Sequence, residues 1–325
     1  DWTEVEAFSA ELERFARGEL TAEEFRGLRL RHGVYGQRQP ERYMVRVKIP
    51  AGRLTANQCE ALGRLAGEFA DGQAHVTTRQ DVQFHYVKLQ DLPRLLRLLA
   101  TVGLTTREAC GNSVRNVTAC PLAGLCRREE FDVSPWAASA AQALLRNART
   151  QQLPRKFKIA FSGCAEDCAL AAINDIGAVA RTEKNNGSTE MSFRLLAGGG
   201  LGPWPQAAQA LAERAPPGEL LTWMEAVLEV FNQYGNRRDR NRARLKFLIA
   251  EKGFEWFRDQ VSAQAMARGA AAPGGPSSTL PAAPKRQEAG NPATSSLRTA
   301  ASADGSGEFQ RWLESNAWPQ RQEGL

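Results

Sequence analysis

Residues 43–103, YMVRVKIPAGRLTANQCEALGRLAGEFADGQAHVTTRQDVQFHYVKLQDLPRLLRLLATVG, switch twice from the two-residue hydrophobic period of a strand to the longer period of a helix. In the first strand, three buried-type positions alternate with three others: Val45, Val47 and Ile49 with Met44, Arg46 and Lys48. The second strand region, 74–89, is expected to turn Val82, Phe84 and Tyr86 to one side and Gln83 and His85 to the other. Helices are expected over 55–70, with Cys59 in the core, and over 92–103. This order predicts an α+β fold, an α/β sandwich with helices packed on a sheet.

The same kind of pattern continues on both sides of this stretch. A charged helical lead-in precedes it, ending at Gly33. After a loop rich in Cys, Asn and Gly, a helix opened by Ser134 and Pro135 begins a second unit. That unit is expected to hold strands at 157–163, 176–181 and 191–200 and helices at 166–175 and 219–235. The predicted domains are a lead-in (1–30), a first α/β unit (31–107), a second (108–262), a linker (263–307) and a final segment (308–325).

The end of the chain has a different composition. Residues 265–307 consist largely of Ala, Gly, Pro and Ser, which cannot bury enough apolar surface to order themselves, and they predict a disordered linker. The last residues, WPQRQEGL at 318–325, echo VYGQRQPERY at 34–43. If the echo is a true repeat, a second copy of the whole unit begins here. The first residue is Asp1 rather than Met, so we expect a processed form or an excerpt of a longer protein.

Composition excludes several classes of protein. The chain has 325 residues, is 42% apolar and contains six cysteines. It has no signal-like N-terminus and no apolar run near eighteen residues, which predicts a cytoplasmic protein with no membrane contact. A formal charge of +6 suits an acidic partner. Because the basic residues are scattered and form no recognised module, we expect no nucleic-acid binding.

Four cysteines form two pairs in loops: Cys120 and Cys126 in CPLAGLC, and Cys164 and Cys168 in CAEDC. Zinc knuckles usually have a C-x2-4-C spacing, and disulfide frameworks belong to short secreted chains. Four thiolates can instead ligate the iron corners of a cubane cluster. The alternatives that remain are a zinc module, or cysteines that serve as small buried apolar residues. Cys110 fits either a core or a site role.

Basic residues gather near these cysteines in the sequence. They lie in TTRQDVQFH (77–85), GNSVRNV (111–117) and LPRKFK (153–158), and include Arg79, Arg115, Arg155, Lys156 and Lys158. Lys156 and Lys158 alternate with Phe157, so both ammonium groups point to one side of a strand. Two such groups repel each other unless an anion lies between them. A small oxyanion or a polycarboxylate cofactor is the expected occupant, and a solvated charged surface is the alternative.

Six collinear motifs carry a resemblance to a known family. They are YMVRVKIPAG (43–52), TTRQDVQFH (77–85), VRNV (114–117), LPRKFK (153–158), LLAGGGLG (195–202) and the basic stretch 234–258. Together with the two cysteine pairs, they resemble the amino-terminal half of the assimilatory sulfite and nitrite reductases, over roughly residues 25–260. The resemblance implies a ferredoxin-like half domain, followed by an α/β domain that binds siroheme and a [4Fe-4S] cluster.

The resemblance also implies roles for individual residues. Cys120, Cys126, Cys164 and Cys168 would ligate the cluster, and Cys168 would bridge it to the siroheme iron. Arg46, Arg115, Lys156 and Lys158 would surround the substrate, while Thr77, Arg79 and Gln83 would hold siroheme carboxylates, with Arg115 close to the cofactor as well. Cations in these positions would bind the anion and help to deliver protons to it.

The sequence departs from the family pattern in one respect. In the family, the substrate cations come from the first half of the protein and the cluster cysteines from the second, whereas this chain carries both sets. We therefore expect two halves to pair about a pseudo-twofold axis, with the lysines and the cysteines of this chain serving different sites. A second half domain or a second copy is the implied partner.

The implied reaction is the six-electron reduction of sulfite to sulfide. Nitrite-reducing relatives tend to have Asn at the position of Lys158, preceded by Trp, so PRKFK favours sulfite. A dianion also gains more than a monoanion from a second ammonium group. Because no flavin or nicotinamide fingerprint is present, we expect a separate donor, ferredoxin or a similarly acidic protein. The alternatives are a ferredoxin-dependent nitrite reductase with the same cofactors, and a non-catalytic half that supports an active partner.

Overall fold

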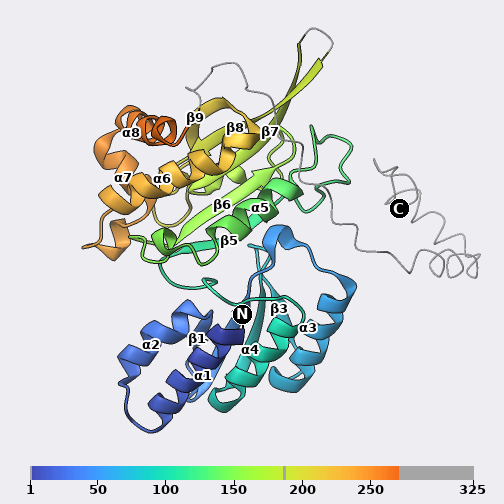
Figure 1. The fold of residues 1–325 in the computed structure, drawn as a ribbon, viewed down its shortest axis with the longest axis vertical. Helices are drawn as coiled ribbons and strands as arrows, with labels where there is room; N and C mark the ends of the chain where they lie inside the picture. Colours follow the sequence, from blue (N-terminus) through green and yellow to red (C-terminus); the bar gives the residue numbers. More distant parts are fainter. Residues whose placement is uncertain (1, 186–187, 271–325) are drawn as a thin grey trace, which may run out of the picture.

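The computed structural model describes residues 2–185 and 188–270, which form two α/β units joined by hydrogen bonds (Figure 1). The first unit begins with two helices, α1 (Trp2–Ala16) and α2 (Ala22–Arg31). The lead-in is therefore helical, as predicted, but it is broken at Gly18, whose φ is +77°. Thr21 and Glu24 form a capping box that begins α2.

A four-stranded antiparallel sheet, in the order β1-β2-β4-β3, forms the centre of the first unit. Its strands are β1 (Val34–Gly36), β2 (Arg42–Val47), β3 (Ala74–Val76) and β4 (Val82–Lys88). The helices α3 (Ala56–Phe69) and α4 (Leu92–Thr101) connect and cover it. Apolar side chains of the strands and of α1, α3 and α4 form one core, so the predicted strand–helix–strand–helix order and the α+β class are confirmed.

Two predictions for this unit were wrong. Tyr86 does not share a face with Val82 and Phe84: it is 44% exposed, and Val87 takes the buried position. A β-bulge causes this, because Tyr43 pairs with Val87 while Val45 pairs with Phe84, leaving one extra residue in β4. Cys59 is also not in the core but exposed, because it lies on the outer side of α3.

The second unit contains a five-stranded sheet in the order β5-β6-β7-β8-β9, in which the first three strands are parallel and the rest antiparallel. Its strands are β5 (Val114–Ala119), β6 (Phe157–Ser162), β7 (Ile176–Asn185), β8 (Ser188–Ala197) and β9 (Gln209–Ala215). Its helices are α5 (Ser134–Leu144), α6 (Leu220–Tyr234), α7 (Leu245–Lys252) and α8 (Phe254–Ala267). The sequence did not predict β9, α7 or α8, and it predicted a loop where β5 pairs with β6.

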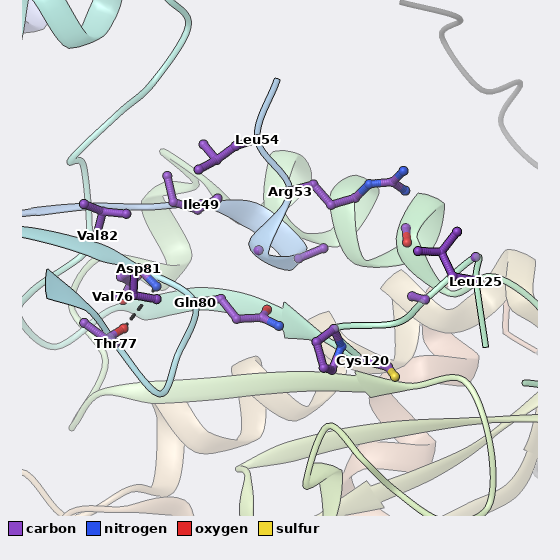
Figure 2. A pocket seen from close by; sticks show the side chains of 16 residues that line it. Ile49, Arg53, Leu54, Val76, Thr77, Gln80, Asp81, Val82, Cys120 and Leu125 are labelled. Carbon is purple, nitrogen blue, oxygen red and sulfur yellow. Dashed lines mark hydrogen bonds between the residues drawn. The ribbon is translucent and has the colours of Figure 1, made fainter. Parts of the chain in front are cut away.

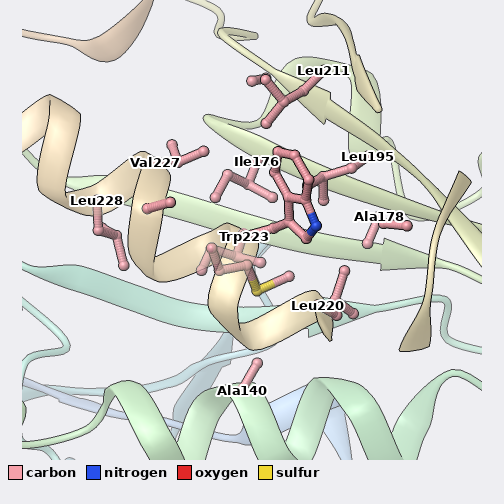
Figure 3. Close-up of a cluster of buried hydrophobic side chains, with 14 of the residues drawn as sticks. Ala140, Ile176, Ala178, Leu195, Leu211, Leu220, Trp223, Val227 and Leu228 are labelled. Carbon is pink, nitrogen blue, oxygen red and sulfur yellow. The ribbon is translucent and has the colours of Figure 1, made fainter. Parts of the chain in front are cut away.

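The helices cover only one face of this sheet. Figure 3 shows Trp223 of α6 among Ile176, Leu195 and Leu211 of three strands, with Ala140 of α5 beneath them. Along β6, Phe157, Ile159 and Phe161 are fully buried in this core. The alternate residues, Lys158, Ala160 and Ser162, therefore point to the opposite face.

The predicted helix over 166–175 was wrong. The segment is an irregular crossover that contains only a short 3-10 turn, Ala171–Ile173. It runs back over the helix-free face, where Ala171 packs with Ala160, Val179 and Leu196. No described helix is long and apolar enough to cross a membrane. The first residues of the predicted linker, 263–267, belong instead to the end of the last helix, where Ala265 packs into the core. The rest of the linker beyond residue 270 and the possible repeat at 308–325 lie outside the described residues, and the domain bounds stay predictions.

Candidate functional site

The parallel strands β5 and β6 bring the first cysteine of each pair to one edge of the sheet. Cys120 directly follows β5, and Cys164 follows β6 after Gly163. The carboxyl ends of neighbouring parallel strands meet at the same edge. The Cys120 amide donates to the Phe161 carbonyl at 2.9 Å, which keeps the two loops side by side.

Polar side chains shape each cysteine loop. In the first loop, the Gly124 amide donates to Glu129 Oε2 at 2.8 Å, and the Cys126 amide donates to the Leu122 carbonyl at 2.9 Å. In the second loop, the Asp167 carboxylate accepts from the Ser162 hydroxyl at 2.5 Å and from the Ala171 amide at 2.6 Å. These bonds satisfy backbone groups that a helix would otherwise pair, which explains why the segment with Cys168 is not helical.

The four thiols lie close enough to influence one another. Burial raises the pKa of the Cys120 and Cys164 thiols, and charge on the neighbouring cysteines raises both further. Arg128 and Glu166 form an ion pair, with 2.6 Å between Nη1 and Oε1, that links the two loops. The Glu166 carboxylate, and then the Cys126 thiol, raise the pKa of Arg128. A positive charge therefore lies beside the four sulfurs.

Across residues 2–185 and 188–270, no three His, Cys, Asp or Glu side chains are placed to hold a single metal ion. Around one zinc ion, sulfur atoms lie about 3.8 Å apart, as follows from a Zn–S bond of about 2.3 Å in a tetrahedron. A cubane separates its thiolates more widely, because each binds a different iron corner. The absence of such a group among the described residues means that no compact single-ion site of the zinc type is formed by the thiols.

The amino-terminal end of the same strands carries the predicted cations. Lys158 lies at the start of β6, and its amide donates to Asp175 Oδ2 at 2.8 Å. Asp175 is fully buried and forms a bidentate ion pair with Arg244, whose Nε and Nη2 lie 3.0 and 2.9 Å from Oδ1. This pair anchors the backbone of Lys158. Phe157 is buried on the other side, as the alternation predicted.

The two lysines have depressed pKa values. Burial, and then the charges of Arg79, Arg244 and Lys156, lower the pKa of Lys158 to about 8. Burial, followed by Arg115, Arg244 and Arg155, lowers the pKa of Lys156. Within the part of the chain that the structure describes, neither ammonium group has a hydrogen-bond acceptor or an ion-pair partner.

Arg46 and Arg115 approach from the two units. Arg46 Nη2 donates to Gln83 Oε1 at 2.8 Å, and its guanidinium lies 5.5 Å from the centre of the Tyr35 ring. Arg115 Nη1 donates to the Ala109 carbonyl at 2.9 Å. Both arginines act electrostatically on Tyr35 and on Cys110, so they lie on either side of these two residues.

Thr77 and Arg79 lie in the turn between β3 and β4. The Thr77 hydroxyl accepts from the amides of Arg79 and Asp81, at 3.2 and 3.0 Å. The Arg79 guanidinium donates to Asn174 Oδ1 at 2.6 Å and to the Asn116 and Ile159 carbonyls, which joins the first unit to the second sheet. Protein groups therefore take up most of its donors, and the buried Nε remains unpaired.

Several residues at this site could not be found from the sequence patterns. The side chains of Tyr35 and Cys110 form a hydrogen bond with each other, close to Arg46 and Arg115. Burial raises the pKa of the Cys110 thiol to about 11. The Asp175–Arg244 pair joins residues 69 positions apart. Two further buried groups, Lys48 and Asp81, lie beside the cations. The sequence offers two weak signals for these residues: the run of basic residues around Arg244 and the acidic residue of the TTRQD turn.

The cations and the thiols lie at opposite ends of the sheet. Six residues of extended chain separate Lys158 from Cys164, which corresponds to roughly 20 Å.

Comparisons with known proteins agree with this geometry. Residues 35–102 match the family described as "Nitrite/Sulfite reductase ferredoxin-like half domain", and residues 110–268 match "Nitrite and sulphite reductase 4Fe-4S domain". The chain belongs to the nitrite and sulfite reductase family. Its predicted family, fold class and cofactors, siroheme and a [4Fe-4S] cluster, are thereby confirmed.

Individual members of this family are similar over most of the chain. "Sulfite reductase [ferredoxin] 1" of Mycolicibacterium paratuberculosis is 36% identical over 217 residues, 67% of this chain and 38% of that protein. "Ferredoxin--nitrite reductase" of Leptolyngbya laminosa is 32% identical over 268 residues, 79% of this chain and 52% of that protein. The solved structure of Mycobacterium tuberculosis NirA matches with a TM-score of 0.72 at 30% identity, covering 82% of this chain and 53% of NirA. The chain spans about half the length of the relatives it matches.

The residues present fit both cofactors. Four thiols on two adjacent loops suit a cubane. Two ammonium groups without acceptors and the unpaired Nε of Arg79 suit a macrocycle that carries carboxylates. Leu122 lies in the first cysteine loop and Leu170 follows the second, and they are 49% and 59% exposed.

Proposed function

We propose that this chain binds sulfite at its cationic end and takes part in the reduction of sulfite to sulfide. The observation that carries the proposal is the gathering of Arg46, Arg115, Lys156 and Lys158, in which both lysines have depressed pKa values and no ion-pair partner among the described residues. Such a cluster is costly in the free protein because the charges repel one another. A bound dianion relieves that repulsion.

Each cation has a distinct part in this proposal. Arg46 and Arg115 are fixed by Gln83 and by the Ala109 carbonyl, and their planar guanidinium groups orient the anion. Lys158, with a pKa of about 8, is charged at neutral pH yet can release its proton. It both holds an oxygen of the anion and protonates it as that oxygen departs as water.

The cofactors would be held by the residues that the family pattern assigns. Thr77, Arg79 and Gln83 would hold the siroheme carboxylates, and Cys120, Cys126, Cys164 and Cys168 would ligate the cluster, with Cys168 linking the two cofactors. When bound, siroheme and the cluster supply the low-potential electrons that the reduction requires. The protein contributes binding, orientation and protons.

The complete catalytic unit consists of two paired halves. The roughly 20 Å of chain between Lys158 and Cys164, which lie at the two ends of β6, supports this. The exposed Leu122 and Leu170 beside the thiols support it further, and so does the length of the relatives, about twice that of the matched region. The second half, or a second copy, covers the cysteine loops.

Sulfite is favoured over nitrite because Lys158 gives the dianion a second ammonium contact. Relatives named for each substrate have similar identities, 36% and 32%, so the proposal for sulfite depends on the site itself. A ferredoxin donor is suggested by the names of both relatives and by the net charge of +6. A cytoplasmic location is part of the same proposal.

The test is an anaerobic absorption spectrum of the full-length protein before and after sulfite or nitrite is added, with iron and acid-labile sulfide counted. Siroheme bands that shift with sulfite, at five irons per site, would support the proposal. Lys158→Asn should raise the ratio of nitrite to sulfite turnover, and Lys252→Asn, on the exposed surface of α7, is the matched control. Bands that respond to neither anion would refute the proposal.

A further inference from the structure

A cavity of about 500 Å³ lies between the first unit and the loop that begins at Cys120. Figure 2 shows it below Leu54 and Ile49, with Asp81 and Thr77 on one side and Cys120 and Leu125 on the other. Its walls are mostly apolar. Two buried oxygen atoms on its wall have no hydrogen-bond partner, Asp81 Oδ1 and Ser134 Oγ. A polar atom of this kind in a space of this size is satisfied by water.

Asp81 is held rigidly at the wall of this cavity. It ends the turn between β3 and β4, and its amide donates to the Thr77 hydroxyl at 3.0 Å, while the Thr77 amide donates to the Asp81 carbonyl at 2.9 Å. Its side chain is only 5% exposed. Among the described residues, no group of either unit forms a hydrogen bond with Asp81 Oδ1, so this oxygen atom takes no part in holding the turn together.

On its other side Asp81 faces the anion site. The groups that act on it are Arg46 and Lys48 from β2 and its continuation, Arg79 from the same turn, and Arg115 from β5. The Cys110 thiol also faces it. Burial raises the pKa of Asp81 to about 6, although these four cations oppose the shift. The carboxyl group thus exchanges its proton near neutral pH while adjoining both the cavity and the arginines.

We propose that Asp81 relays protons from water in the cavity to the anion bound by Arg46 and Arg115. This inference rests on the proposed function. The Asp81 carboxyl gives its proton to an oxygen of the anion through water, and the carboxylate then takes a proton from the cavity. Each oxygen that leaves as water consumes two protons and two electrons, and the electrons come from a ferredoxin-type one-electron donor through the bound cofactors. Asp81 acts through water and is therefore a positioning and relay residue.

The test compares Asp81→Asn with Asp71→Asn in the reconstituted full-length protein. Asn preserves the shape of the side chain but cannot exchange a proton, and Asp71 lies on an exposed turn of the same unit. General acid catalysis contributes about 10²–10⁴-fold, so kcat should fall by at least about 100-fold in Asp81→Asn. The decline of kcat as the pH rises above about 6 should disappear with it. Sulfite affinity, read from the siroheme bands, should be unchanged or higher because a negative charge is lost.

A second variant tests the same proton relay in case Asp81→Asn does not fold. Leu54→Phe narrows the cavity from a half-buried wall position without touching the carboxyl group, and should lower kcat with no change in sulfite affinity. Wild-type kcat and pH dependence in Asp81→Asn would overturn the relay, as would loss of siroheme from that variant. By contrast, a wild-type protein that binds neither anion would show that the proposed function fails.

Discussion

The buried Asp175–Arg244 pair should dominate the stability of the second unit, and Asp175→Asn tests this. Asp175 is fully buried and accepts four hydrogen bonds: three from the Arg244 guanidinium and one from the Lys158 amide at 2.8 Å. Asn has the same shape, but either orientation of its amide places an N–H group against one of these donors. The variant therefore loses hydrogen bonds and leaves the Arg244 charge uncompensated.

Removing one partner of a buried ion pair costs about 3–5 kcal/mol. For a unit of this size the midpoint of thermal unfolding falls by ~2–4 °C per kcal/mol, so the expected decrease is roughly 6–20 °C. Burial raises the pKa of Asp175 even though Arg244 opposes the shift, so the carboxylate depends on its arginine. The double variant Asp175→Leu/Arg244→Met should recover part of the loss, because no charge is then left buried.

Thermal unfolding followed by circular dichroism, with urea unfolding as a second measurement, provides the assay. Glu6→Gln is the control, since it breaks the exposed ion pair with Arg97 in the other unit and should change stability little. If Asp175→Asn is no less stable than this control, the pair does not hold the start of β6, and the account of how Lys158 is positioned is wrong.

Three further predictions address other parts of the molecule. Nitrite stays a monoanion across neutral and alkaline pH, so the affinity of the protein for nitrite should weaken as the pH rises through about 8, the pKa of the Lys158 ammonium. The Lys158→Arg variant should bind nitrite with no such decline. A nitrite titration at several pH values, monitored by absorption, checks this. Thr55→Ala should destabilise the first unit by about 1 kcal/mol in urea unfolding, because Thr55 accepts from the Gln58 amide at 3.2 Å and caps α3. Gly177→Ala should lower the bound iron per chain, because a Cβ there would lie 2.6 Å from the Ala171 carbonyl and displace the crossover that carries Cys168; unchanged iron content would contradict this.

The parts of the fold with a clear hydrophobic period could be predicted from the sequence. Alternation predicted β2 and β6, and the burial of Phe157 opposite the lysines follows from it. The crossover at 166–175 has helix-forming residues, but Asp167 satisfies its amides from the side, and no periodicity reveals such a bond. The bulge at Tyr86 was equally invisible, because one extra residue in a strand leaves the composition unchanged.

The candidate site also has residues that the sequence predicted and residues that it did not. Local patterns and the family resemblance predicted the thiols and the four cations, since each lies in a short motif, and their roles stay predictions. It did not identify Asp81 or Lys48, because their importance comes from burial beside charges contributed by other strands. Long-range pairs such as Arg79 with Asn174 depend on how the two units meet, which sequence periodicity does not encode.

Because the cations and the thiols lie apart, a variant of one set should leave the function of the other set intact. If the cations and the thiols of this chain serve different cofactor sites, each set can be lost without the other. In the full-length protein, Cys164→Ser should lower non-haem iron and acid-labile sulfide while the siroheme held at the cationic end remains. Lys158→Met should retain the iron and sulfide and weaken sulfite binding several-fold, since one charged contact is lost.

The two sets of residues are expected to fail independently because the six residues from Lys158 to Cys164 put roughly 20 Å between them. Cys59→Ser, which removes an exposed thiol outside the two loops, provides the control for the cysteine variant and should change neither cofactor. Loss of siroheme and cluster together in Cys164→Ser would place the thiols and cations of one chain at a single centre. The pairing of two halves would then have no basis in the geometry of this sheet.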